Sequence, residues 1–157
     1  METPLDRTDR RLIELLVQNA RLSNRDLAER VGLSPSACLE RVRRLFDRGV
    51  LTGAHAVVDP GALGVGVQAV VAVRLARHTR ELVEAFRQHT IALPEVRALY
   101  HVTGEHDFLM HVATRDIQHL RDFTMDALTT QHGVAHLESF VVFAAQTKPG
   151  WPDYLED

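Results

Sequence analysis

Two helical patterns near the start of the chain are separated by only two residues, Gly32 and Leu33. The first pattern opens with the capping box S-N-R-D (23–26), and a glycine ends it. The second pattern opens at the N-cap residue Ser34, is followed at once by proline, and stops at Gly49. Because the connection is so short, the two helices must meet at a steep angle across a tight turn.

A further helical pattern precedes these two, so the first third of the chain is predicted to be a set of three helices. It opens at Asp6 and runs to about Asn19. The last of the three, 35–48, has two different faces: Cys38 lies among apolar neighbours as a small core residue, and the other side offers arginine and serine. A helix, a tight turn and a helix with an exposed basic face form the helix-turn-helix plan that reads a DNA major groove. The sequence therefore predicts double-stranded DNA as a partner.

Charge is distributed unevenly along the chain, whose formal net charge is -3 at pH 7. Residues 1–53 hold ten basic against eight acidic side chains, whereas residues 54–157 hold eight against thirteen. This difference indicates two domains, of which 1–53 is the helix-turn-helix domain. The N-terminus is too charged for a signal peptide and no run of 18 apolar residues occurs, so we expect a cytoplasmic protein without a membrane partner.

Residues 54–66 are predicted to be a strand and linker between the domains, with an extended strand at 50–58 and a turn at D-P-G (59–61). The remainder alternates between strand patterns at 68–76, 96–103, 107–113 and 137–145 and helix patterns that open at Thr79 and Asp116. This order is β-α-β-β-α-β, which predicts a ferredoxin-like domain over 67–148 and an overall α+β fold. An acidic C-terminal tail, 149–157, follows.

The strand patterns carry a second inference, about assembly. V-Q-A-V-V-A-V (67–73) and F-V-V-F-A-A (140–145) are apolar at both alternating positions. Helices cover one face of such a sheet, so the other face also needs a cover. We expect this cover to be a second copy of the chain, which gives a homodimer with two recognition helices related by a two-fold axis.

Two stretches of the sequence carry a family resemblance, namely L-S-N-R-D-L-A-E-R-V-G-L-S-P-S-A-C-L-E-R-V-R-R-L-F-D-R-G-V-L-T-G (22–53) and V-T-G-E-H-D-F-L (102–109), and L-S-P-S-A-C-L-E-R-V-R-R-L is its most specific part. In these stretches the chain resembles the Lrp/AsnC family of bacterial and archaeal transcription regulators. It implies a helix-turn-helix (winged-helix-like) domain, a ferredoxin-like effector-binding domain, and dimers that join into octamers. It also implies an amino acid or related small metabolite as the effector, and no cofactor.

The resemblance also indicates which residues contact DNA and effector. The candidate DNA-binding residues are Ser23, Asn24, Ser34, Ser36, Glu40, Arg41, Arg43, Arg44 and Arg48. The candidate effector-binding residues are Thr103, Gly104, Glu105, His106, Asp107 and Ser139. Backbone N–H groups near Gly104 can hold a carboxylate, and Asp107 can pair with an α-ammonium or, alternatively, stabilise the turn. This chain has Leu137 where many members have threonine, and Ser139 supplies a hydroxyl two residues on.

An enzyme alternative exists, because the same two-domain plan occurs in siroheme decarboxylases. If a hairpin over 102–110 is centred on His106, then His101 and His111 lie opposite each other, a geometry compatible with a metal or a tetrapyrrole. No third ligand is placed by the sequence, and a decarboxylase has no need of a basic recognition helix. We therefore expect a regulator, with no catalytic residues and no metal.

Overall fold

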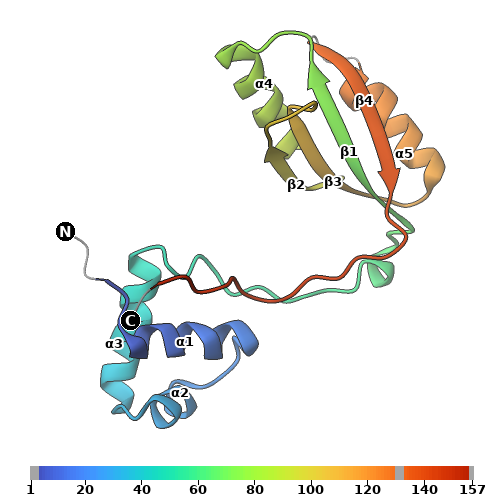
Figure 1. Ribbon diagram of the computed structural model, residues 1–157. Coiled ribbons are helices and arrows are strands. Elements are labelled where there is room, and N and C mark those ends of the chain that lie inside the picture. Colours follow the sequence, from blue (N-terminus) through green and yellow to red (C-terminus); the bar gives the residue numbers. More distant parts are fainter. Residues whose placement is uncertain (1–3, 130–132, 156–157) are drawn as a thin grey trace. The chain divides into compact units, whose positions relative to one another are not determined.

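The computed structural model describes residues 4–129 and 133–155 and divides the chain into two compact units. Met1–Val57 and Gln146–Asp157 form the helical unit, and Val58–Ala145 form the sheet unit. The helical unit contains three helices, and the sheet unit contains a four-stranded sheet with helices packed on it (Figure 1). The predicted α+β class is therefore confirmed.

Each helix of the helical unit begins at the predicted capping residue. The three helices are α1 (Arg7–Gln18), α2 (Asn24–Val31) and α3 (Pro35–Asp47). Asp6, Ser23 and Ser34 accept hydrogen bonds from the backbone N–H groups of Asp9, Asp26 and Ala37, respectively. Gly32 ends α2 in the left-handed conformation at φ +68°, which glycine adopts without steric cost. The short connection thus turns the chain directly into α3.

The three helices share one apolar core. Leu12, Leu27, Cys38 and Leu45 are all buried in it. Burial raises the pKa of the Cys38 thiol, so this cysteine remains protonated and behaves as a small apolar residue, as the sequence predicts. The apolar face of α3 therefore packs in the core, and its opposite face is exposed to solvent.

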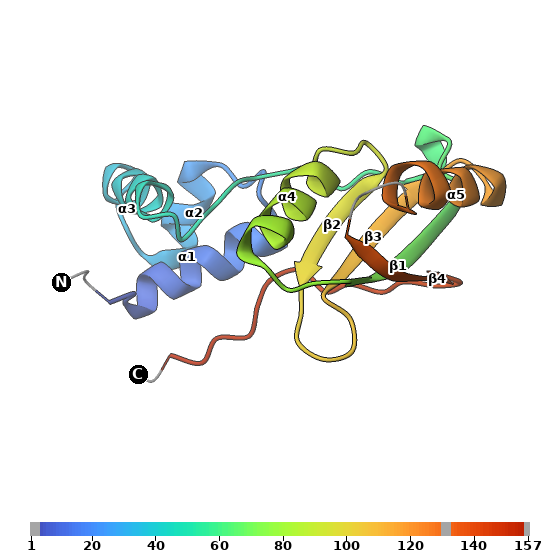
Figure 2. The same ribbon diagram turned by 90° about the horizontal axis from the view of Figure 1, so that it is seen from above.

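The sheet unit has the predicted β-α-β-β-α-β order. Its strands are β1 (Val67–Leu75), β2 (Val96–His101), β3 (Phe108–Thr114) and β4 (Val134–Val141), and its helices are α4 (Arg80–Ile91) and α5 (Ile117–Phe123). A 3-10 turn, Gly61–Leu63, precedes β1, and a π-helical segment, Thr124–Thr129, continues α5. The strands are antiparallel in the order β2-β3-β1-β4. Figure 2 shows α4 and α5 on the same side of the sheet, where they cover the core around Val71, Phe108 and Met110.

Two predicted strands differ from the structure. Residues 50–58 form no strand, and the fully exposed Val57 has no neighbouring strand with which to pair among the described residues. The last strand, Val134–Val141, begins and ends earlier than 137–145: its pairs with β1 run from Val134 to Val141, and the Val142 N–H donates one further hydrogen bond to the Gln68 carbonyl. Beyond this point Phe143 is fully exposed. Only the start of β4 coincides with an end of its partner strand, because Val134 pairs with Leu75, the last residue of β1, and local patterning does not report where a partner strand ends.

The β2–β3 hairpin also differs from the prediction. His101 pairs with Phe108, and His111 pairs with Ala98, so the two histidines are not opposite each other. The His101 ring instead stacks on Phe108 at a centroid distance of 4.8 Å, and the His111 ring shares a hydrogen bond with Gln68 at 2.9 Å. The prediction that His101 and His111 form a cross-strand pair suited to a metal or a tetrapyrrole is therefore wrong.

The face of the sheet opposite the helices is mixed and not uniformly apolar. Tyr100 and Phe140 are 59% and 54% exposed there by register. Gln68, His111 and Glu138 add polar groups to the same face. This face therefore offers exposed aromatic rings together with hydrogen-bonding groups.

Among the described residues, no helix combines the length and the apolar character needed to cross a bilayer.

Candidate nucleic-acid interface and effector loop

The exposed face of α3 collects polar side chains at the start and the middle of the helix. Ser34 caps the helix, and its hydroxyl shares a hydrogen bond with that of Ser36 at 3.2 Å. Ser36, Glu40 and Arg43 are all exposed. Hydroxyl groups at a helix N-terminus and a guanidinium one or two turns later are groups that contact phosphates and base edges.

Two arginines of α3 are engaged with α1. Arg41 Nη1 donates to Asp6 Oδ2 at 2.6 Å and to Asp9 Oδ1 at 2.8 Å. Arg44 Nη2 lies 3.3 Å from Asp9 Oδ2. The side chain of Asp9 is only 2% exposed, so its carboxylate is satisfied by these two arginines in place of water. Arg41 and Arg44 thus fix α3 against α1, and Arg44 keeps a half-exposed guanidinium.

The start of α2 is joined to the start of α3. Asn24 Nδ2 donates to the backbone carbonyl of Pro35 at 2.7 Å, so the two helix starts are adjacent. Ser23 is engaged locally, since its hydroxyl donates to Asp26 Oδ2 at 2.7 Å. The predicted residues Ser23, Asn24, Ser34 and Ser36 are therefore brought to one region of the unit. Arg48 lies at the opposite end of α3, as its C-cap.

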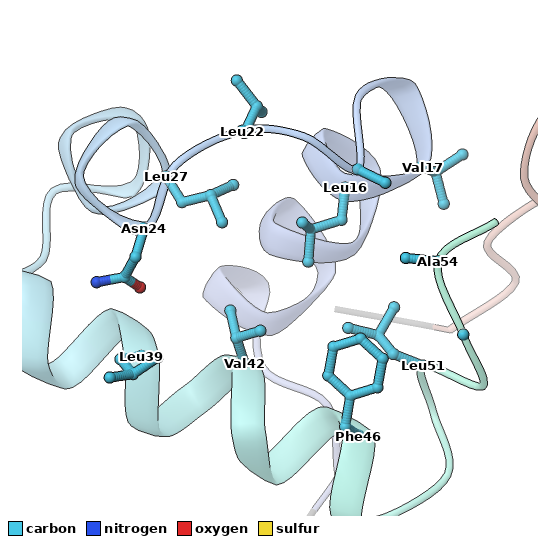
Figure 3. Close-up of a pocket in the computed structure, with 12 residues that line it drawn as sticks. Leu16, Val17, Leu22, Asn24, Leu27, Leu39, Val42, Phe46, Leu51 and Ala54 are labelled. Carbon is cyan, nitrogen blue, oxygen red and sulfur yellow. The ribbon is translucent and has the colours of Figure 1, made fainter. Parts of the chain in front are cut away.

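An apolar pocket of about 300 Å³ lies inside the helical unit. Figure 3 shows Val42 and Phe46 of α3 directed toward Leu16 of α1, with Asn24 at one end of the pocket. Phe46 is 43% exposed at its rim. The pocket is an open edge of the helical core, and none of the predicted effector residues lines it.

The predicted effector loop, 103–107, joins β2 to β3. Gly104 has φ +117°, a conformation that favours glycine, and Thr103 and Glu105 are exposed. His106 Nε2 lies 3.5 Å from Glu138 Oε2, whose other oxygen is 3.1 Å from His136 Nε2. The loop therefore rests against β4 through Glu138. Ser139 is the next residue on that strand and projects to the other face, so it does not join the loop within one chain.

Asp107 is buried and anchors the loop to the end of β1. Its Oδ2 accepts a hydrogen bond from the backbone N–H of Leu75 at 2.6 Å, and its Oδ1 lies 3.0 Å from His78 Nδ1. Its own backbone N–H donates to the carbonyl of Val73 at 2.9 Å. Asp107 thus has the turn-stabilising role that the sequence left open. A carboxylate can accept several hydrogen bonds, so Asp107 can stabilise the turn and still accept a further hydrogen bond from a ligand.

A polar hollow of about 490 Å³ lies beside this anchor. It is lined by His78, Thr79, Arg80, Val83, Glu84 and His101. Hydrogen bonds from Arg87, and then from Gln88, lower the pKa of Glu84 to about 2, so this carboxylate is charged at neutral pH. The hollow therefore has the guanidinium of Arg80 in its lining, whereas the charge of Glu84 is already paired with Arg87.

The structure brings in two residues that the sequence did not single out, Asp9 and His78. Asp9 could have been suspected, because an acidic residue on the inward side of α1 requires a cation. His78 could not, because only the fold places it against Asp107. Across the described part of the chain, no group of three or more His, Cys, Asp or Glu side chains is arranged to hold a metal ion.

Comparison with known proteins gives matches over both units. Residues 5–45 match the AsnC-type helix-turn-helix domain, and residues 68–150 match the Lrp/AsnC ligand binding domain. The chain is 40% identical over 139 residues to the HTH-type transcriptional regulator AldR of Mycolicibacterium smegmatis, covering 88% of this chain and 81% of that protein.

Solved structures match over nearly the whole chain. A transcriptional regulator of Neisseria meningitidis, solved as a complex with L-Met, has a TM-score of 0.86 and 34% identity, covering 93% of this chain and 94% of the other. AsnC of E. coli has a TM-score of 0.85 and 26% identity, covering 95% and 99%. The relatives are named as transcriptional regulators, which supports the expected non-enzyme over the decarboxylase alternative.

Asp6 makes the stability of the helical unit depend on pH. Its hydrogen bond from the Asp9 N–H, and then its contact with Arg41, lower the pKa of the Asp6 carboxyl below its ordinary value near 4. The charged carboxylate therefore contributes stability above that ordinary value, and the contribution is lost as pH falls through the lowered pKa. We expect wild type to exceed Asp6→Asn in urea-unfolding free energy at pH 6, with the difference shrinking toward pH 3. Asparagine still caps a helix, so a difference independent of pH would contradict this role for the charge.

Asp107 is expected to be a stability residue whatever else it binds. Asp107→Ala leaves the buried N–H of Leu75 without its acceptor, which costs about 1–3 kcal/mol of unfolding free energy. The exposed His78 adds little to this loss. Asp107→Asn is the matched control, since its amide oxygen can still accept the bond. Equal urea midpoints for Asp107→Ala and wild type would show that the bond is not needed.

Proposed function

We propose, since the chain belongs to the Lrp/AsnC family of transcriptional regulators, that it binds double-stranded DNA through α3 and that a small-molecule effector bound by the sheet unit changes this binding. The observation that carries the proposal is that different side chains of α3 hold the helix in place and face the solvent. Arg41 and Arg44 hold the helix to α1, and this leaves Ser36 and Arg43 on the exposed face. A fixed helix with an exposed polar face can enter a major groove in one orientation.

Among the candidate DNA-binding residues, Arg43 is proposed as a base or phosphate contact from the middle of α3. Ser34, Ser36, Ser23 and Asn24 would meet the phosphates near the joined starts of α2 and α3. Arg41 would act mainly by positioning the helix, because both of its acidic partners already hold its guanidinium. Glu40 lies between Ser36 and Arg43 on the exposed face and would face the same groove, whereas Arg44 and Arg48 would lie at the flank of the contact.

The effector is proposed to be an amino acid or a related small metabolite held at the loop 103–107. Backbone N–H groups beside Gly104 suit a carboxylate, and the Asp107 carboxylate suits an α-ammonium. The Neisseria meningitidis relative was solved with L-Met, which supports a ligand of this class. Thr103, Glu105 and His106 would shape the side-chain end of the site, and Ser139 would contribute only from the other face of β4.

We propose a homodimer, assembling further to an octamer, as the functional form. The support is the face of the sheet opposite the helices, where Tyr100 and Phe140 are more than half exposed. A second sheet would cover both rings and pair their polar neighbours. An effector can alter DNA binding in such an assembly only by favouring one arrangement of the recognition helices over another.

Replacing Arg43 by alanine is expected to weaken DNA binding. The loss should be about 1–3 kcal/mol if the guanidinium reads a base, or a decrease of about one in the salt slope if it contacts phosphate. Fluorescence anisotropy with labelled duplex DNA measures both quantities. Arg121→Ala, on α5 of the sheet unit, is the matched control for loss of one positive charge. Equal affinities and salt slopes for the two variants would refute the placement of DNA on α3.

Replacing Gly104 by alanine is expected to weaken effector binding. The positive φ of Gly104 strains any other residue by about 1–3 kcal/mol, which shifts the loop and lowers affinity about tenfold or more. Gly64→Ala is the matched control, because Gly64 also has a positive φ with no atom within 4 Å of an added Cβ, but lies outside the loop. Isothermal titration of amino acids into wild type first identifies the ligand. Undiminished affinity of Gly104→Ala for it would place the site elsewhere.

A further inference from the structure

The C-terminal tail packs on the first helix of the helical unit. Arg10 Nη1 donates to the backbone carbonyl of Leu155 at 3.1 Å and lies 3.6 Å from Asp153 Oδ2. Gly150 lies so close to α1 that an added Cβ would be 2.8 Å from Val17 Cγ1. The segment from Gly150 to Leu155 therefore runs along α1 and is held at both ends.

The acidic group of the tail lies within a cluster of arginines. Arg7, Arg10 and Arg11 of α1 surround a hollow of about 470 Å³ together with Glu14 and Asp153. Glu14 is paired with Arg11 at 2.7 Å. Three arginines thus line one hollow together with one helix carboxylate and one tail carboxylate. Such a cluster fits the oxygen atoms of a phosphate as well as those of a carboxylate.

The tail is attached with little apolar burial. Trp151 and Tyr154 are 96% and 87% exposed, although they are its largest side chains. The attachment therefore depends mainly on the ionic contact and the hydrogen bond of Arg10, both of which salt and competing anions weaken. Residues 149–157 contain three acidic and no basic side chains, so the tail carries the charge of a phosphate competitor.

We propose that Arg7, Arg10 and Arg11 form a second phosphate-binding surface for double-stranded DNA, and that the acidic tail occupies this surface as an internal competitor. The inference rests on the proposed DNA-binding function and adds a site outside α3. Binding to the surface requires the tail to leave, so DNA first has to displace Asp153. The tail therefore weakens non-specific binding, which depends on phosphate contacts alone, more than binding that also gains from base contacts.

The test measures the affinity of the full chain for a labelled duplex of arbitrary sequence between about 50 and 200 mM salt. Asp153→Asn removes the competing charge, and Glu81→Gln, on α4 of the sheet unit, is the control for loss of one negative charge. One additional phosphate contact steepens the salt slope by about 0.9, which is roughly 3.5-fold in affinity across this range. We expect Asp153→Asn to bind DNA with this steeper salt slope and higher low-salt affinity. Glu81→Gln should show only a smaller increase in affinity. The double variant Asp153→Asn/Arg10→Gln should lose the increase.

Trp151 gives a second readout, because it is the only tryptophan of the chain. Its fluorescence anisotropy should fall when DNA displaces the tail. The inference is overturned if Asp153→Asn matches Glu81→Gln in affinity and slope, or if the Trp151 anisotropy is unchanged at saturating DNA. In those cases, the proposed function still stands if Arg43→Ala weakens DNA binding. Absence of DNA binding by every variant, at all salt concentrations, overturns both proposals.

Discussion

The buried carboxylate of Asp9 is the contact on which the proposed DNA-binding face of α3 depends. It lies between Arg41 and Arg44, so it joins α1 to α3 through one acid and two arginines. Its side chain is 2% exposed and cannot exchange these partners for water. The pairing fixes the rotation of α3 about its axis, and rotation decides which side chains point outward. Arg43 is exposed because Cys38 and Leu45 are buried in the core and Arg41 and Arg44 are held by Asp9, which leaves the opposite side of α3 to solvent.

The sheet unit uses a buried acid in a similar way. Asp107 binds the N–H of Leu75 and contacts His78, and so ties the β2–β3 loop to the end of β1. This bond holds the loop in the shape that leaves Gly104 and Glu105 exposed. In both units an acidic side chain first stabilises the element that is proposed to bind a partner.

The sequence predicts the local features of this fold well. The caps at Asp6, Ser23, Ser34, Thr79 and Asp116 all occur as predicted, because a cap depends on residues only a few positions apart. Contacts between residues far apart in the sequence could not be predicted as well. The hairpin register that separates His101 from His111, the missing strand at 50–58 and the Asp107–His78 contact all depend on where another segment lies.

Hydrogen–deuterium exchange of the full chain, with and without duplex DNA at low salt, tests the central claim most directly. The claim is that DNA is bound by the exposed face of α3 and not by the β2–β3 hairpin, whose loop is proposed to hold the effector. The account predicts slower exchange in peptides covering 34–48 when DNA is present, and unchanged exchange across the β2–β3 hairpin, 96–114. Protection of the hairpin without protection of 34–48 would contradict it.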